Sequence, residues 1–316
     1  MSDIPQTGQD RRRPRRERRL PGSRLLVVIP ALWLIVFFLV PFFIVGKISL
    51  SQTVIAQPPY LPVFDLAAGF EQLKQDLASL SLDAYGLIAS DALYLFSYFK
   101  SVQVALIATA ILLCIGFPIA YAIARAPRRW QPVLFMLVVL PFWTSFLIRI
   151  YAWMNILQRD GLFNQMLLAL GIVDTPPAWL ASDTAVMIGL VYSYLPFMVL
   201  PIYATLERMD ETLLEAAADL GAPRWKAFWL VTLPLARPGI VAGMLLCFIP
   251  ILGEFVIPDL LGSSETAMIG QVLWTEFFSN KDWPVASALA VVLLALLLWP
   301  ILLYQRAQIR VTEGPR

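Results

Sequence analysis

The sequence predicts an all-α membrane protein with six transmembrane helices and both termini in the cytoplasm. Of the 316 residues, 59% are hydrophobic and the mean hydropathy is +0.71, whereas soluble domains are roughly 45–50% apolar. Several apolar runs are long enough to cross about 30 Å of hydrocarbon. The basic residues gather in segments that such a topology places on one side. These features indicate a multi-span membrane protein rather than a soluble enzyme.

The composition also restricts the chemistry of the chain. There is no His, which removes histidine-based acid/base catalysis, Ser-His triads and His-ligated metals. The two cysteines, Cys114 and Cys247, fall inside predicted spans. We expect both to be small buried residues rather than a disulfide or a metal site. No catalytic and no metal-binding residue is therefore predicted.

The chain begins with a basic segment, residues 1–24, which we expect to be a disordered cytoplasmic tail. Its arginines favour a membrane anchor over a nucleic-acid-binding arm, so no nucleic-acid partner is predicted. One membrane domain, 25–304, follows, and its six predicted spans are 25–48, 101–124, 132–154, 184–205, 238–260 and 285–304. A cytoplasmic tail, 305–316, comes after the last span.

Polar connections separate these spans. The longest, 49–100, contains Pro58, Pro59 and Pro62 near its start and a helical pattern around 69–82. The connection 155–182 contains a predicted helix at 162–170, which ends at Gly171 because glycine readily adopts the left-handed conformation of a helix end. Both connections are predicted to lie outside the cell membrane, on the side opposite the termini.

The distribution of charge orients the bundle. Arginine and lysine concentrate before the first span, in the 125–131 turn, in the segment 207–237 and in the C-terminal tail. The positive-inside rule places these segments in the cytoplasm. The opposite side holds only Lys74, Lys100, Arg159 and Lys281 among many acids. Such an acidic face raises the local concentration of cations, or simply reflects the depletion of bases outside; both interpretations stay open.

The fifth span carries a carboxylate, Glu254, beside Pro250 and Gly253. Ionisable residues inside a membrane are costly and are candidates for function, and broken helices line cavities. We predict a substrate pathway formed by Glu254 and by aromatic side chains of similar depth, Trp143, Tyr151, Tyr192 and Tyr194. The alternative is that Glu254 forms a structural ion pair with Arg149.

The segment 207–237 is the longest polar break in the second half of the chain. Asp210 is a good N-cap, and Gly221 with Pro223 predicts the end of a short helix. Four residues at helical spacing form a small apolar face, and three acids lie on the opposite side; these are Leu213, Ala216, Ala217 and Leu220, and Glu211, Glu215 and Asp219. Three like charges in a row predict a basic partner elsewhere.

The spacing of Glu215-Ala216-Ala217, Gly221 and Val231-x-Leu233-Pro234 resembles the EAA loop of ABC importer permeases. Val231 departs mildly from that pattern, since the family usually has Ile there. The resemblance implies a type I importer permease fold in which 207–237 is a cytoplasmic coupling loop. It also implies that Glu215, Ala216, Ala217, Asp219 and Gly221 couple the chain to an ATPase subunit.

Four further stretches, 141–153, 194–210, 253–262 and 281–290, are similar to the polyamine branch of these permeases. This resemblance covers nearly the whole chain from about residue 24. It implies a bacterial inner-membrane subunit that takes up putrescine, spermidine or both. The implied partners are a second, homologous permease, a homodimeric cytoplasmic ATPase and a periplasmic polyamine-binding protein. ATP and magnesium would bind the ATPase, since this chain has no P-loop sequence and is predicted to carry no cofactor.

There are three alternative functions. The first, an importer permease for another small organic substrate, has the same architecture. A stand-alone secondary transporter has no use for an acidic docking helix such as the one predicted within 207–237. An intramembrane enzyme is disfavoured because the chain lacks His and lacks paired carboxylates on one buried face.

Overall fold

The computed structural model describes residues 22–64, 69–263 and 266–313. The basic tail predicted to be disordered therefore lies almost wholly outside the described residues. The chain divides into two compact units, Met1–Lys47 and Ile48–Arg316. In the first unit, α1 (Gly22–Leu34), the π-helical turn η1 (Ile35–Leu39) and α2 (Val40–Ile48) form one apolar helical run. Its side chains from 28 to 44 are exposed, as expected for a helix that meets lipid.

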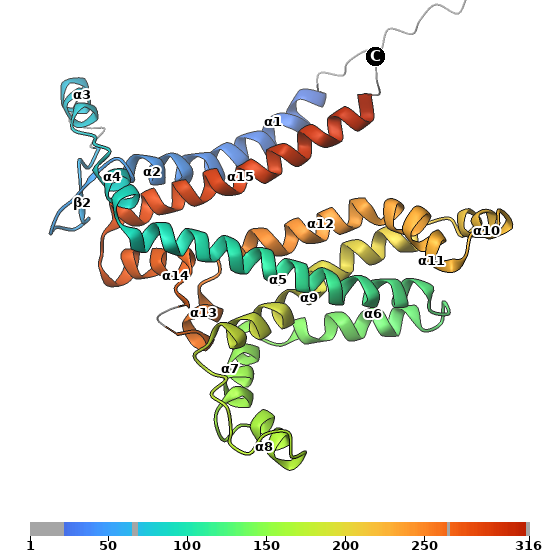
Figure 1. Cartoon of the computed structure of the whole chain (residues 1–316). Coiled ribbons are helices and arrows are strands. Elements are labelled where there is room, and N and C mark those ends of the chain that lie inside the picture. The colour runs from blue at the N-terminus through green and yellow to red at the C-terminus, as the bar shows by residue number, and fades with distance from the viewer. Residues whose placement is uncertain (1–21, 65–68, 264–265, 314–316) are drawn as a thin grey trace, which may run out of the picture. The chain divides into compact units, whose positions relative to one another are not determined.

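The core of the second unit consists of three long helices packed on one another, α5 (Ala92–Arg125), α9 (Asp183–Glu207) and α12 (Leu233–Leu252) (Figure 1). Small residues allow the backbones to approach closely. A Cβ atom on Gly239 of α12 would lie 2.4 Å from Thr205 Oγ1 of α9. A Cβ atom on Gly116 of α5 would lie 2.8 Å from the Met198 side chain, also of α9. The glycines thus fix the helix crossings on both sides of α9.

The third predicted span, 132–154, is not one straight helix. It consists of α6 (Gln131–Val139), the 3₁₀ turn η2 (Leu140–Trp143) and α7 (Phe146–Leu157), with a bend of 89° after η2. Thr144 and Ser145 adopt extended backbone angles, and the Thr144 hydroxyl donates to the Pro141 carbonyl at 2.8 Å. The helix therefore ends there and restarts in a new direction. In Figure 1, α7 and α8 (Leu162–Ala169) point away from α6.

The fifth predicted span, 238–260, is displaced toward the N-terminus. Helical structure begins at α11 (Arg224–Ala227), continues through the π-helical turn η3 (Phe228–Thr232) and ends with α12 at Leu252. Pro238 and Pro250 lie inside this run without breaking it, as happens where neighbouring helices support a membrane helix. The break comes at Gly253, after which α13 (Val256–Leu261) restarts the chain. Of the break expected at Pro250 and Gly253, the part at Gly253 is confirmed and the part at Pro250 was wrong. The second half of 207–237 belongs to a long helix.

The remaining elements of the second unit are a strand pair and several further helices. They include a short antiparallel pair, β1 (Gln52–Thr53) with β2 (Tyr60–Leu61), in the register Gln52 with Leu61 and Thr53 with Tyr60. The helices are α3 (Phe70–Ala78), α4 (Asp83–Ser90), α14 (Ile269–Trp274), the π turn η5 (Thr275–Ser279) and α15 (Trp283–Glu313). A second apolar cluster joins α4, α5, α14 and α15, where Tyr98 donates to the Leu289 carbonyl at 2.6 Å.

Four helices of the described residues are long and apolar enough to cross a membrane, and the bent α6–α7 pair would be a fifth. The four are Val28–Ile48, Ala92–Arg125, Asp183–Glu207 and Arg224–Leu252. α15 contributes a shorter apolar stretch, Trp283–Trp299. Cys247 is buried as expected, but Cys114, on α5, is exposed, so that expectation was wrong for one of the two cysteines. The structure is thus a mostly helical membrane protein.

Candidate functional site

The predicted short helix within 207–237 is α10 (Thr212–Asp219). Asp210 Oδ1 accepts from the Thr212 backbone N–H at 3.0 Å, and this bond lowers the pKa of the Asp210 carboxyl from its ordinary value. At the other end, Gly221 has φ +76°, its N–H donates to the Ala218 carbonyl at 2.8 Å, and the next N–H donates to the Ala217 carbonyl at 3.0 Å. This pair of bonds is a Schellman motif, which needs the left-handed conformation that glycine adopts without strain.

The side chains of α10 are presented to the outside. Leu220 is 89% exposed and Leu213 is 45% exposed, so the small apolar face is uncovered in this chain. Glu215, Ala216 and Asp219 are exposed as well, and Ala217 is half-buried. In Figure 1, α10 lies beyond the ends of α9 and α12, next to α11. An exposed apolar patch of this kind is a candidate for contact with another protein.

One of the three acids of this segment has a partner within the chain. Arg125, at the end of α5, donates to Glu211 Oε1 at 3.0 Å, and its guanidinium lies 5.6 Å from the centre of the Tyr121 ring. The pair borders a polar cleft of about 1000 Å³ between the α5–α6 turn and the end of α9. The basic partner expected for the acidic row therefore exists for Glu211, and the sequence signal for it was the basic turn 125–131. Among the described residues, Glu215 and Asp219 form no ion pair.

The second predicted centre is Glu254, in the break between α12 and α13. The Tyr194 hydroxyl, on α9, donates to Glu254 Oε2 at 2.5 Å, and the Val256 N–H donates to Oε1 at 3.1 Å. A Cβ atom on Gly270 would lie 2.4 Å from the Gly253 carbonyl oxygen, so only glycine lets α14 approach this break. Glu254 is half-buried and held at two oxygens. It is therefore a partly exposed carboxylate whose two oxygens are both fixed by hydrogen bonds.

The alternative partner, Arg149, makes no ion pair with Glu254 in the described part of the chain. Its guanidinium lies over two aromatic rings, 4.7 Å from the centre of Phe142 and 5.8 Å from that of Phe146. Arg149 is only 8% exposed, yet its Nε and Nη1 atoms have no hydrogen-bond partner among the residues that the structure describes. The structure thus separates the two charges that the sequence could have paired.

The aromatic pathway candidates do not form one cluster. Tyr194 contacts Glu254, as described above. Tyr192 is half-buried and packs edge-on against Trp153 with ring centres 5.5 Å apart. Trp143 is 70% exposed and Tyr151 is 49% exposed. Of the five candidates, the structure brings together Glu254 and Tyr194, while the roles of all five remain predictions.

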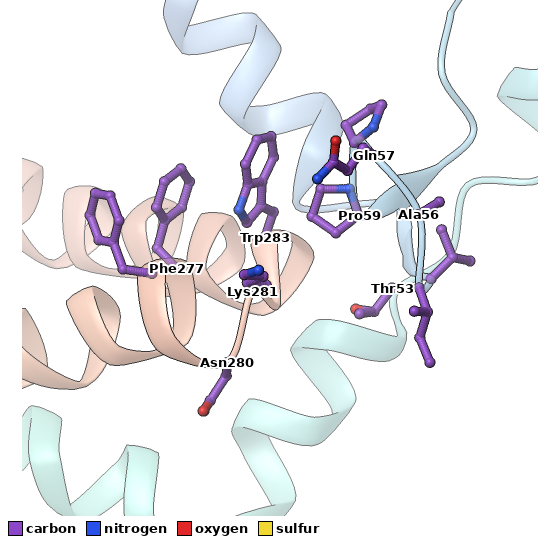
Figure 2. A pocket seen from close by; sticks show the side chains of 12 residues that line it. Thr53, Ala56, Gln57, Pro59, Phe277, Asn280, Lys281 and Trp283 are labelled. Atoms are coloured by element: carbon purple, nitrogen blue, oxygen red, sulfur yellow. The ribbon is translucent and has the colours of Figure 1, made fainter.

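A further cavity, of about 1030 Å³, lies between the β1–β2 loop and the segment 277–283. Figure 2 shows the Trp283 ring between Phe277 and Pro59, with Lys281 beside it. The Trp283 and Phe277 rings are stacked with centres 5.0 Å apart, and Thr53 Oγ1 donates to Asp282 Oδ1 at 2.7 Å. Ile55, in the loop, is fully exposed. Two connections far apart in sequence therefore build one apolar hollow, which the sequence did not reveal.

Comparison with known proteins agrees with this architecture. Residues 116–310 match the family described as binding-protein-dependent transport system inner membrane component. The chain is 42% identical over 227 residues to the spermidine/putrescine transport system permease protein PotB of Salmonella typhimurium, covering 72% of this chain and 79% of that protein. It is 44% identical over 215 residues to PotB of Haemophilus influenzae, covering 68% and 75%.

Among solved structures, a chain of the bacterial alginate ABC transporter in complex with alginate pentasaccharide-bound periplasmic protein has the same fold. Its TM-score is 0.67 at 17% identity, and the match covers 93% of this chain and 96% of that one. A likeness at this identity concerns the fold alone. The family resemblance inferred from residues 215–234 is confirmed by the family match and by the relatives. This chain belongs to the binding-protein-dependent transport system inner membrane component family and is a multi-pass inner-membrane permease of an ABC transporter.

Proposed function

We propose that this chain is one permease subunit of an ATP-driven importer that takes up putrescine, spermidine or both from the periplasm. The observation that carries the proposal is the 42% identity, over 227 residues, to a permease named for spermidine and putrescine transport. The chemistry of the site agrees with a cationic substrate. Glu254 is a held carboxylate beside aromatic side chains, and carboxylates with π faces attract ammonium groups.

The proposed topology has six crossings with both termini in the cytoplasm. The crossings are the α1–α2 run, α5, α6 with α7, α9, α11 with α12, and α15. This arrangement puts the basic 125–131 turn and α10 on the cytoplasmic side and the β1–β2 loop on the periplasmic side, in agreement with the positive-inside rule. The cavity lined by Trp283 then faces the periplasm, where a binding protein delivers its cargo.

The proposed complex contains a second, homologous permease, two copies of a cytoplasmic ATPase and a periplasmic polyamine-binding protein. ATP and magnesium bind the ATPase, and this chain transmits its movement. α10 docks on the ATPase through its exposed Leu213, Leu220, Glu215 and Asp219, and the continuous run from α11 into α12 carries the motion to the break at Gly253. Closure and opening of the ATPase pair thereby switch access to Glu254 between the two sides.

The proposal is tested by uptake of radiolabelled putrescine and spermidine in cells that lack their own polyamine importers. The chain is supplied with its second permease, ATPase and binding protein, and each component is then omitted in turn. We expect uptake that is lost whenever any one component is missing. Uptake that persists without the ATPase would identify a secondary carrier. A fully assembled complex that takes up neither polyamine would refute the substrate assignment.

A further inference from the structure

A cavity of about 630 Å³ lies where the bend of the third span meets α9 and α12. It is separate from the break that holds Glu254, although Tyr194 borders both. The lining is almost entirely apolar and includes Phe142 and Phe146; its polar members are Arg149, Ser193 and Tyr194. The cavity reaches the surface beside Leu246, which is 50% exposed, and Phe197, which is 38% exposed.

Among the described residues, the guanidinium of Arg149 lacks hydrogen-bond acceptors for part of its edge. A guanidinium stays charged at any physiological pH and carries five donors in a planar fork. The rings of Phe142 and Phe146 satisfy its face, but they accept nothing from the N–H groups at its edge. Within the described residues, the Nε and Nη1 atoms are buried without partners. A buried charge with unmet donors is strongly unfavourable, so an acceptor must complete it.

Ser193 supplies a second unpartnered donor beside this cavity. Ser193, on α9, is 4% exposed, lines the same cavity and has no hydrogen-bond partner at Oγ in the part of the chain that the structure describes. Arg149 and Ser193 both line this cavity, and their unpartnered donor atoms are buried beneath its apolar surface. A carboxylate suits such a pair because it accepts a guanidinium fork at both oxygens. The nearby carboxylate of this chain is already engaged, because Glu254 accepts from Tyr194 and Val256.

We propose that Arg149 and Ser193 form a carboxylate-binding site that an acidic side chain of the second permease fills when the two permeases associate. The proposal rests on the proposed function, which supplies that second permease. A polyamine has no acidic group, and hydrocarbon tails have no acceptor. The cavity opens at the surface between α9 and α12, and its one fixed positive charge requires an opposite charge from the protein that covers it. Arg149 is therefore an assembly residue of the permease pair.

The first test measures association. The chain carries an affinity tag, and the second permease recovered with it from detergent-solubilised membranes is quantified. We expect Arg149→Met, which keeps much of the side-chain length without the charge, to lower recovery about tenfold. Arg149→Lys should be intermediate because it keeps the charge without the fork. Arg159→Met is the matched control, since Arg159 is exposed shortly after the same helix, and it should match the wild type.

The second test excludes misfolding as the cause. Arg149→Glu should abolish recovery, and an Asp or Glu of the second permease changed to Arg should restore it at one position when the membrane-embedded acids are scanned. A general folding defect cannot be repaired by a charge on another protein. Recovery of Arg149→Met at the wild-type level, or no restoring position in the scan, would overturn the proposal.

Two further outcomes distinguish a contact between the two permeases from a contact within this chain. Restoration of Arg149→Glu by Glu254→Arg in the same chain would show that Arg149 pairs within the chain, and would overturn the proposal while leaving the importer function intact. Failure of the wild-type chain to recover any second permease would refute the heterodimer itself, and with it both this proposal and the proposed function.

Discussion

Gly221→Val is expected to lower ATP-driven polyamine uptake about tenfold or more without loss of the chain from the membrane. Gly221 has φ +76°, and a left-handed conformation costs an L-residue roughly 1–2 kcal/mol, more for a β-branched one. Nothing lies within 4 Å of the position of its Cβ atom, so the effect is on the backbone rather than on packing. The Schellman bonds then break, and α10 loses the fixed end that orients its docking surface.

The matched control for this prediction is Gly171→Val. Gly171 also has a positive φ, +66°, and nothing lies within 4 Å of its Cβ position, but it follows α8 on the opposite side of the proposed membrane. Uptake and ATP hydrolysis are measured together in a purified, reconstituted complex. We expect Gly221→Val to hydrolyse ATP without matching uptake and Gly171→Val to behave as the wild type. Equal loss in both would assign the effect to backbone strain in general.

Glu254→Gln is expected to lower uptake roughly 10- to 100-fold while the complex still assembles. The amide keeps the size of the side chain; its oxygen can accept from the Val256 N–H while its NH2 group donates to the Tyr194 hydroxyl oxygen, so the change removes mainly the charge. A hydrogen bond to a charged group contributes about 1.5–3 kcal/mol, and about 1.4 kcal/mol corresponds to a factor of ten. The measurement is initial uptake rate against polyamine concentration, with recovery of the second permease as the test of assembly.

Asp259→Asn serves as the control for the charge at Glu254. Asp259 is an exposed carboxylate on α13 that accepts from Gln271 Nε2 at 3.1 Å, so its neutralisation changes the charge near the site without touching the held carboxylate. We expect uptake close to that of the wild type. Wild-type uptake by Glu254→Gln would instead give Glu254 a purely structural role in the break between α12 and α13.

Local signals in the sequence predicted the short helix α10 well. Asp210 and Gly221 act at the two ends of α10, because capping depends on residues within one helical turn. The helix predicted at 162–170 was likewise found at Leu162–Ala169, before Gly171. These elements are set by their own neighbours in the chain, so a single sequence contains the information that determines them.

The features set by long-range packing were missed. Every face of the long helices is apolar, so periodicity does not tell which face meets a neighbour. The sequence therefore left open whether Glu254 pairs with Arg149, and the structure instead shows a hydrogen bond from Tyr194, 60 residues away. The role of Glu254 in a substrate pathway stays a prediction. The bend at Thr144 and the continuation of the helix through Pro250 depend on how neighbouring helices satisfy backbone groups. The cavity that Arg149 lines was not predicted, because its residues come from three separate helical segments.

The most direct test of the account is whether α10 touches the ATPase in the assembled importer. Leu220, 89% exposed, is replaced by the photo-crosslinking residue p-benzoylphenylalanine, and Leu170, 68% exposed at the end of α8, is replaced in the same way as the control. We predict a light-dependent adduct with the ATPase from position 220 and none from position 170. An ATPase adduct from position 170, or none from position 220 in an assembled and active complex, would contradict the proposed topology and coupling.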